Sequence, residues 1–140
     1  MTNREAGEPL VKEAQRIFER DLKAAWTEGD YKMTLRRAQE VVELALKGAL
    51  RILGVDFPKV HDVGPVFVEQ ARGKGGQVPE GILEEIRRIS AWLSEARAPA
   101  FYLDRTYGEA DAQRAFAEAQ FVLTEVRKAF RISSQETERV

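Results

Sequence analysis

Apolar residues recur three and four positions apart through most of the chain, which is the spacing of one buried face on a helix. The clearest case runs over Tyr31–Leu53, where an apolar stripe lies opposite a side rich in charged residues. Its apolar positions are Leu35, Ala38, Val41, Val42, Ala45, Leu46, Ala49, Leu50, Ile52 and Leu53. A stripe this wide can pack against more than one neighbour, so the sequence predicts that this helix is central to the fold.

The same spacing predicts four further helices. They are expected over Glu8–Glu28, over a short segment at Val63–Ala71, from Pro79 to about Arg97, and over Glu109–Phe130. No segment shows the alternation of apolar and polar residues that a half-buried strand requires. Helices whose apolar stripes have this spacing pack well when they lie nearly antiparallel to one another. The predicted fold is therefore all-α, an antiparallel up-and-down helical bundle with four long helices plus a short fifth.

Single residues predict where the central helix begins, ends and packs. Asp30 is expected to cap its first turn by accepting hydrogen bonds from free amides. Gly54 is expected to end it, because glycine readily adopts positive φ. Gly48 stands in the interior, where glycine destabilises a helix by about 1 kcal/mol relative to alanine. It therefore predicts a close helix crossing, either within the bundle or across a dimer.

Two further segments carry signals for loops. Pro99 is expected to stop the fourth predicted helix near Arg97, because the residue before a proline disfavours helical geometry. The stretch Arg72–Gln77 contains three glycines and is expected to be a mobile interhelical loop. The helices together predict a single domain over residues 8–131, with residues 1–7 and 132–140 expected to fray.

Composition narrows the possible chemistry. The chain has 140 residues, a formal charge of -1, no cysteine and a single histidine. Disulfides, thiolate metal sites, Cys–His dyads and multi-histidine metal sites are therefore excluded, and we expect no metal and no cofactor. With a pI near 6.0, any basic surface for nucleic acid must be local. No apolar run could span a bilayer and the first residues lack a secretory core, so we expect a cytoplasmic protein without a membrane partner.

The first candidate site lies at His61 and Asp62, just before the short predicted helix. Helix N-termini present free amides and favour anions. Lys59 and His61 would add donors beside them. The alternative is structural: Asp62 caps the helix, and His61 bonds to the backbone and packs at the end of the bundle. The sequence leaves both interpretations open.

The second candidate site follows the fourth predicted helix, where Arg97 and Arg105 stand among Phe101, Tyr102 and Tyr107. Arginine can stack on aromatic rings and form paired hydrogen bonds to phosphate, which suits a nucleotide or a nucleic acid. The same segment equally suits a loop that packs on the end of the bundle. The candidate ligand-binding residues are Lys59, His61, Asp62, Arg97, Tyr102 and Arg105.

Three motifs occur in a characteristic order along the chain. The central helix carries Ala38, Glu43, Ala45, Leu46, Lys47 and Leu50, in the pattern A-x-x-x-x-E-x-A-L-K-x-x-L. Lys59–Val63 follows, and a later predicted helix ends in Arg97-Ala98-Pro99. In order and spacing these motifs resemble the HEPN domain family, from about Leu10 to Phe130. The resemblance implies a helical bundle that commonly forms a homodimer and often works beside a minimal nucleotidyltransferase encoded next to it.

Many HEPN proteins are metal-independent ribonucleases that use an arginine and a histidine four to six residues apart on one helix. In that arrangement histidine moves protons and arginine stabilises phosphate charge. This chain departs from the pattern. The nearest arginine before His61 is Arg51, on a different predicted helix, and no histidine follows Arg97 or Arg105. The Arg-Tyr-Pro element of many relatives appears here as Arg97-Ala98-Pro99.

The missing spacing favours a protein that is not an enzyme. The leading hypothesis is a non-catalytic HEPN-type protein that binds a nucleotide, partners a minimal nucleotidyltransferase in a toxin–antitoxin-like pair, or does both. One alternative is a ribonuclease toxin whose active site departs from the family pattern. In that site His61 is the base, and Arg97 or Arg105 stabilises the charge that develops on the phosphate. The other is a structural homodimer without a ligand, with Trp26, Trp92 or Phe101 in its interface. Contact with nucleic acid stays open.

Overall fold

The computed structural model describes the backbone of residues 1–74, 77–102 and 106–133, and their side chains except those of 98–102. All the regular secondary structure in this part of the chain is helical, with no strand, which confirms the all-α prediction. The elements are α1 (Asn3–Arg16), η1 (Ile17–Leu22), α2 (Lys23–Thr27), α3 (Tyr31–Ile52), α4 (Gly64–Lys74), α5 (Glu80–Tyr102) and α6 (Glu109–Phe130).

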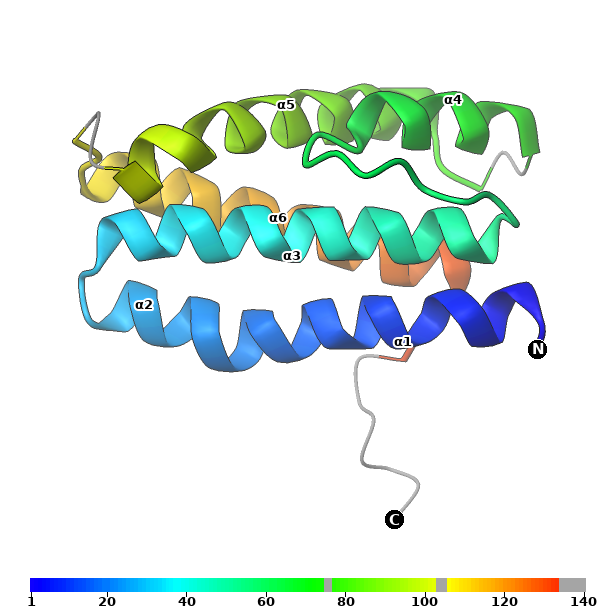
Figure 1. Ribbon diagram of the computed structural model, residues 1–140, viewed down its shortest axis with the longest axis horizontal. Helices are drawn as coiled ribbons and strands as arrows, with labels where there is room; N and C mark the ends of the chain where they lie inside the picture. Colours follow the sequence, from blue (N-terminus) through cyan, green and yellow to red (C-terminus); the bar gives the residue numbers. More distant parts are fainter. Residues whose placement is uncertain (75–76, 103–105, 134–140) are drawn as a thin grey trace, which may run out of the picture.

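The helices form an up-and-down bundle around α3 (Figure 1). The π-helical segment η1 joins α1 to α2, so the three form one continuous rod on one side of α3. Helices α4 and α5 lie on the other side, and α6 lies behind. Every other helical element contacts α3. Its central position therefore agrees with the width of its apolar stripe.

A close crossing of α1 and α3 explains the glycine inside the central helix. A Cβ placed on Gly48 would lie 2.8 Å from the carbonyl oxygen of Gly7 and 2.6 Å from Cγ2 of Val11. Both neighbours belong to α1, so the crossing lies within the bundle. At the two ends of α3, Asp30 accepts a hydrogen bond from the Met33 amide at 3.2 Å, and Gly54 has a φ of 81°. The predicted cap at Asp30 and the predicted helix end at Gly54 are both confirmed.

The first helix begins earlier than its apolar pattern indicates, at Asn3 rather than Glu8. Thr2 and Glu5 form a capping box. The Thr2 hydroxyl accepts from the Glu5 amide at 3.0 Å, and the Glu5 carboxylate accepts from the Thr2 amide at 2.8 Å. This reciprocal pair gives hydrogen-bond acceptors to two amides that would otherwise have none at the helix N-terminus. The cap therefore extends the helix into residues that carry no apolar stripe.

Two predicted helix ends were wrong. Helix α4 continues to Lys74, three residues into the predicted loop Arg72–Gln77. Helix α5 continues past Arg97 and through Pro99 to Tyr102. A proline inside a helix removes one amide from the hydrogen-bond ladder, and its ring crowds the carbonyl four residues earlier. The preceding turns of α5 are buried against the core (Ile86, Ile89, Leu93 and Ala96), and this packing outweighs the local preference of the residue before proline.

Helix α6 spans Glu109–Phe130, as its apolar spacing predicted. Its buried face includes Ala112, Ala119, Leu123, Val126 and Phe130. Of the helices in the described residues, none combines the length and the apolar character needed to cross a bilayer.

Candidate functional site

A buried glutamine joins three elements of the fold. Gln39 lies on the apolar face of α3 and is only 2% exposed. Its amide nitrogen donates to Glu43 Oε1 at 2.9 Å and to the His61 carbonyl at 3.4 Å. Its amide oxygen accepts from Arg97 Nε of α5 at 3.0 Å. Because both ends of the amide are bonded, Gln39 fixes the positions of the His61 backbone and the Arg97 guanidinium.

One turn further along α3, Glu43 forms the centre of the cluster. Its Oε1 accepts from Gln39 and lies 3.0 Å from His61 Nδ1, and its Oε2 accepts from Lys47 Nζ at 2.7 Å. Burial raises the pKa of Glu43, but the hydrogen bonds from Lys47, Gln39 and His61 together outweigh it. The pKa of Glu43 therefore lies below its ordinary value. Glu43 is a carboxylate at neutral pH and can hold the His61 ring in place.

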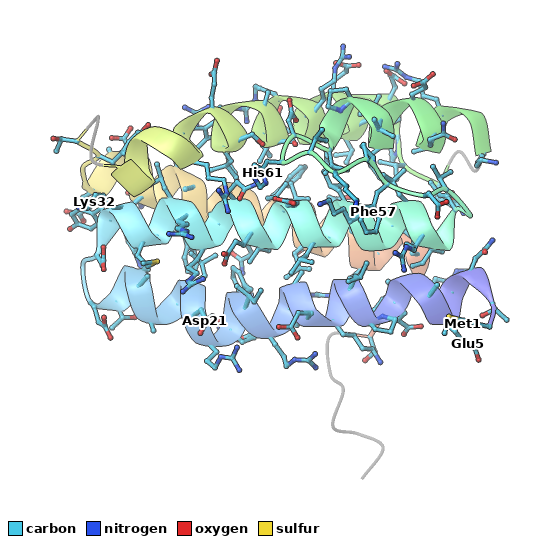
Figure 2. The ribbon with its side chains drawn as sticks, viewed as in Figure 1. Met1, Glu5, Asp21, Lys32, Phe57 and His61 are labelled. Atoms are coloured by element: carbon cyan, nitrogen blue, oxygen red, sulfur yellow. The ribbon has the colours of Figure 1, made fainter. Side chains whose placement is uncertain are left out.

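His61 lies on the connector between α3 and α4, which runs back alongside α3 toward α5 (Figure 2). Its side chain is 55% exposed, whereas that of Glu43 is 16% exposed. A carboxylate beside Nδ1 favours the tautomer that carries a proton there, which leaves Nε2 as the remaining acceptor in the neutral ring. The ring is therefore anchored on one edge and accessible to solvent.

Asp62 fastens the start of α4 to α5. Its Oδ1 accepts from the Ser90 hydroxyl at 2.7 Å, and the same hydroxyl accepts from the Gly64 amide at 3.1 Å. The direct cap predicted for Asp62 is thus replaced by an indirect one through Ser90. A Cβ on Gly64 would lie 2.8 Å from Cβ of Ser90. Asp62 therefore holds the neighbouring His61 in place, and its own carboxylate is already engaged.

Two cations lie against an aromatic ring beside the cluster. Lys47 Nζ is 5.0 Å from the ring centroid of Phe57, and the Arg51 guanidinium carbon is 4.8 Å from it. Cations within about 6 Å of an aromatic face are attracted to it. Phe57 thereby holds the connector against α3, and Lys59, two residues later, is exposed. From Glu43 to Asp62 the chain carries three cations, Lys47, Arg51 and Lys59, and three carboxylates, Glu43, Asp56 and Asp62.

The structure unites some of the candidates predicted from sequence. His61 and Arg97 both bond to Gln39, and Lys59 and Asp62 lie on the same connector as His61. Tyr102 ends α5, but its side chain lies outside the described residues, as does all of Arg105.

The sequence prediction missed Gln39 as a site residue. Its signal was a polar side chain inside the apolar stripe of α3, next to Ala38 and three residues before Val42. A buried polar group needs partners, so such a residue indicates a network.

This arrangement favours recognition of an anion. Lys47, Lys59 and Arg97 are positive and Glu43 and Asp62 are negative, so these residues carry a net charge of +1 with His61 neutral. An arginine held through Nε keeps further N–H groups for a phosphate. Within the described residues, no three His, Asp or Glu side chains gather in a way that could hold a metal ion.

Comparison with protein families found one match. The HEPN domain model matches residues 4–129, nearly the whole chain, which agrees with the resemblance seen in the sequence motifs. Comparisons with curated proteins and with solved structures returned no match.

Proposed function

The chain belongs to the HEPN family, and on this basis we propose that it is a non-catalytic HEPN-type protein that binds a nucleotide at His61 and Arg97. The observation that carries the proposal is the bonding of both residues to the buried Gln39. The two residues lie far apart in sequence, and a buried amide holds them at one place on the surface.

Charge and geometry support a phosphate at this place. The Arg97 guanidinium can form paired hydrogen bonds to phosphate oxygens, and the exposed His61 ring adds a further donor when its Nε2 is protonated. Lys47 contributes charge although it is bonded to Glu43. The family's ribonuclease spacing of arginine and histidine on one helix is absent, which favours binding over cleavage.

Isothermal titration calorimetry with ATP tests the nucleotide proposal. Arg97→Gln should weaken binding about tenfold or more, because a charge-assisted hydrogen bond contributes about 1.5–3 kcal/mol. His61→Ala should also weaken it. The matched control is Arg87→Gln on the same helix, where Arg87 pairs with Glu84 at the surface. Equal affinities for Arg97→Gln and Arg87→Gln, or no heat of binding to the wild type, would contradict the proposal.

The proposal includes a protein partner. HEPN proteins of this kind often work beside a minimal nucleotidyltransferase encoded next to them, in a toxin–antitoxin-like pair, and commonly form homodimers. Co-expression with the nucleotidyltransferase of the neighbouring reading frame, followed by light scattering on a sizing column, tests both parts. The expected species is a complex that contains two HEPN chains. Separate elution of the two proteins, with the HEPN chain monomeric, would contradict this part.

One observation favours a second candidate function, RNA cleavage. The Glu43 carboxylate orients the His61 imidazole through Nδ1, as a carboxylate does for a histidine that acts as a general base. Arg97 would then stabilise the charge that develops on the phosphate. Cleavage of a fluorogenic RNA in the presence of EDTA should be lost in His61→Ala. If the wild type cleaves no faster than this variant, the candidate fails.

The third hypothesis, a ligand-free homodimer through exposed aromatics, gains less support. Trp92 donates from its indole nitrogen to Glu118 at 2.6 Å, and the Arg114 guanidinium carbon lies 4.2 Å from its ring centroid. Trp26 is half-buried and packs near Tyr31 and Phe116. Both tryptophans thus have partners within the chain, and the side chain of Phe101 lies outside the described residues.

A further inference from the structure

A separate pocket is lined by residues from the first turn of α1 and the last turns of α3 and α6. Figure 1 shows that the N-terminus lies at this end of the bundle. The volume of the pocket is about 670 Å³, within the range of about 300–1,000 Å³ typical of small-molecule sites. It forms where the start of α1 meets the ends of α3, α4 and α6. Its principal lining residues are Arg4, Ile52, Leu53, Lys74, Phe130 and Arg131.

The lining divides into a cationic part and an apolar part. Arg4, Lys74 and Arg131 are the charged members, and no acidic residue lines the pocket among the described residues. Glu8 lies close by and pairs with Arg4 at 3.2 Å, which leaves two positive charges in excess. Ile52, Leu53 and Phe130 provide apolar surface. Such a combination suits a ligand with an anionic head and an apolar body.

Arg131 occupies a backbone conformation that costs energy. Its φ of 56° and ψ of 51° are left-handed, and at the C-terminal cap of a helix this conformation usually belongs to glycine. The turn is held by the Ile132 amide, which donates to the Arg127 carbonyl at 2.8 Å. The Arg131 carbonyl also accepts from Arg4 Nη2 at 2.7 Å. Strain of this kind concentrates at functional sites, and here the turn places the Arg131 carbonyl where it binds the Arg4 guanidinium at the edge of the pocket.

From these observations we infer that the pocket binds a small organic phosphate monoester. The phosphate lies among Arg4, Lys74 and Arg131, and the apolar or aromatic body lies against Ile52, Leu53 and Phe130. A phosphate monoester carries about -1.5 to -2 charges at pH 7, which matches the excess of two positive charges. The pocket is distinct from the His61 site, since Ile52 lies roughly 14 Å beyond Glu43 along α3.

Titration of phenyl phosphate into the ¹⁵N-labelled protein, followed by amide NMR spectra, tests the inference. The expected result is a saturable shift of the amides of Leu53, Lys74 and Arg131. The variant with both Lys74→Gln and Arg131→Gly should bind at least ten times more weakly. Glycine adopts the left-handed conformation without the cost of a Cβ, so the change removes the cation and keeps the turn. Lys32→Gln, at the opposite end of the bundle (Figure 2), should bind like the wild type.

Two further ligands test separately how much the anionic phosphate and the apolar ring contribute to binding. Inorganic phosphate, which lacks the body, and benzyl alcohol, which lacks the charge, should each bind much more weakly than phenyl phosphate. Inorganic phosphate that binds equally well would mean an adventitious ion only and would overturn the inference. The inference also fails if phenyl phosphate causes no saturable shift at millimolar concentration, if the double variant binds as well as the wild type, or if the shifts centre on His61 and Arg97.

Discussion

At the scale of single residues, Gln39 determines the geometry of the candidate site although it is almost wholly buried. It bonds to Glu43, His61 and Arg97, whereas a ligand at the surface would meet only the last two. A buried polar network in which every group is bonded fixes side chains more firmly than surface contacts can. Gln39 is therefore a positioning residue, and the accessible donors belong to its partners.

The depressed pKa of Glu43 makes stability depend on pH. A carboxylate whose folded pKa lies below its unfolded value, about 4.3, stabilises the fold above that value. This contribution is lost as the pH falls through the lower folded pKa. We expect the free energy of unfolding of the wild type to decrease more steeply below about pH 5 than that of Glu43→Gln.

Urea unfolding of both proteins between neutral and acidic pH measures the difference. Glu69→Gln, which changes an exposed glutamate of α4, should follow the wild-type curve. Parallel curves for Glu43→Gln and the wild type would show that the carboxylate network contributes no pH-dependent stability.

At the scale of elements, close approaches between helices set the arrangement around the site. Gly48 lets α3 contact α1, and Gly64 lets α4 begin against Ser90 of α5. Because Gly64 lies against Ser90, the connector that carries His61 is held against α5 as well as against α3. The packing of elements therefore determines where the polar side chains meet.

The crossing of α1 and α3 predicts the effect of one methyl group. Gly48→Ala should destabilise the fold by about 1–3 kcal/mol, because the new Cβ meets the backbone and side chains of α1 and the helices must separate. Gly81→Ala, in the first turn of α5 where nothing lies within 4 Å of a new Cβ, should stabilise by about 0.4–1 kcal/mol. Urea midpoints measure both changes. If the two variants shift in the same direction, the crossing is looser than described.

Two serines on α5 provide a second matched pair. Ser90→Ala should cost about 1–3 kcal/mol, because the Gly64 amide and the Asp62 carboxylate both lose a buried partner. The Ser94 hydroxyl is buried and lacks a hydrogen-bond partner within the described part of the chain. Ser94→Ala should therefore be neutral or stabilising. Thermal unfolding of the two variants measures the difference, and equal losses would refute the role given to Ser90.

At the scale of the whole molecule, the bundle could be predicted because each long helix carries its own apolar stripe. The stripe of Tyr31–Leu53 indicated the central helix, and α6 has the predicted bounds. The helix ends were less predictable. The continuation of α5 through Pro99 depends on packing against distant residues, which a local signal such as a proline cannot reveal.

The site was predictable only in part, for the same reason. His61 and Arg97 could be proposed from their residue types, but their connection depends on bonds to Gln39 across 22 and 58 positions of sequence. The position of Gln39 within an apolar stripe was the one visible sign of that network. Side chains that are distant in sequence and meet only in the folded chain produce no local sequence motif that could reveal their contact.

The most direct test of the nucleotide site is an NMR titration of ATP that follows the Arg97 Nε–H and the His61 ring resonances. We expect both sets of signals to shift together and to saturate with one affinity, because Gln39 holds the two residues at one site. Gln39→Leu, which alters no exposed group, should weaken ATP binding severalfold. Signals of Arg97 and His61 that stay unchanged at saturating ATP, or that titrate with different affinities, would contradict a single nucleotide site on this face of the bundle.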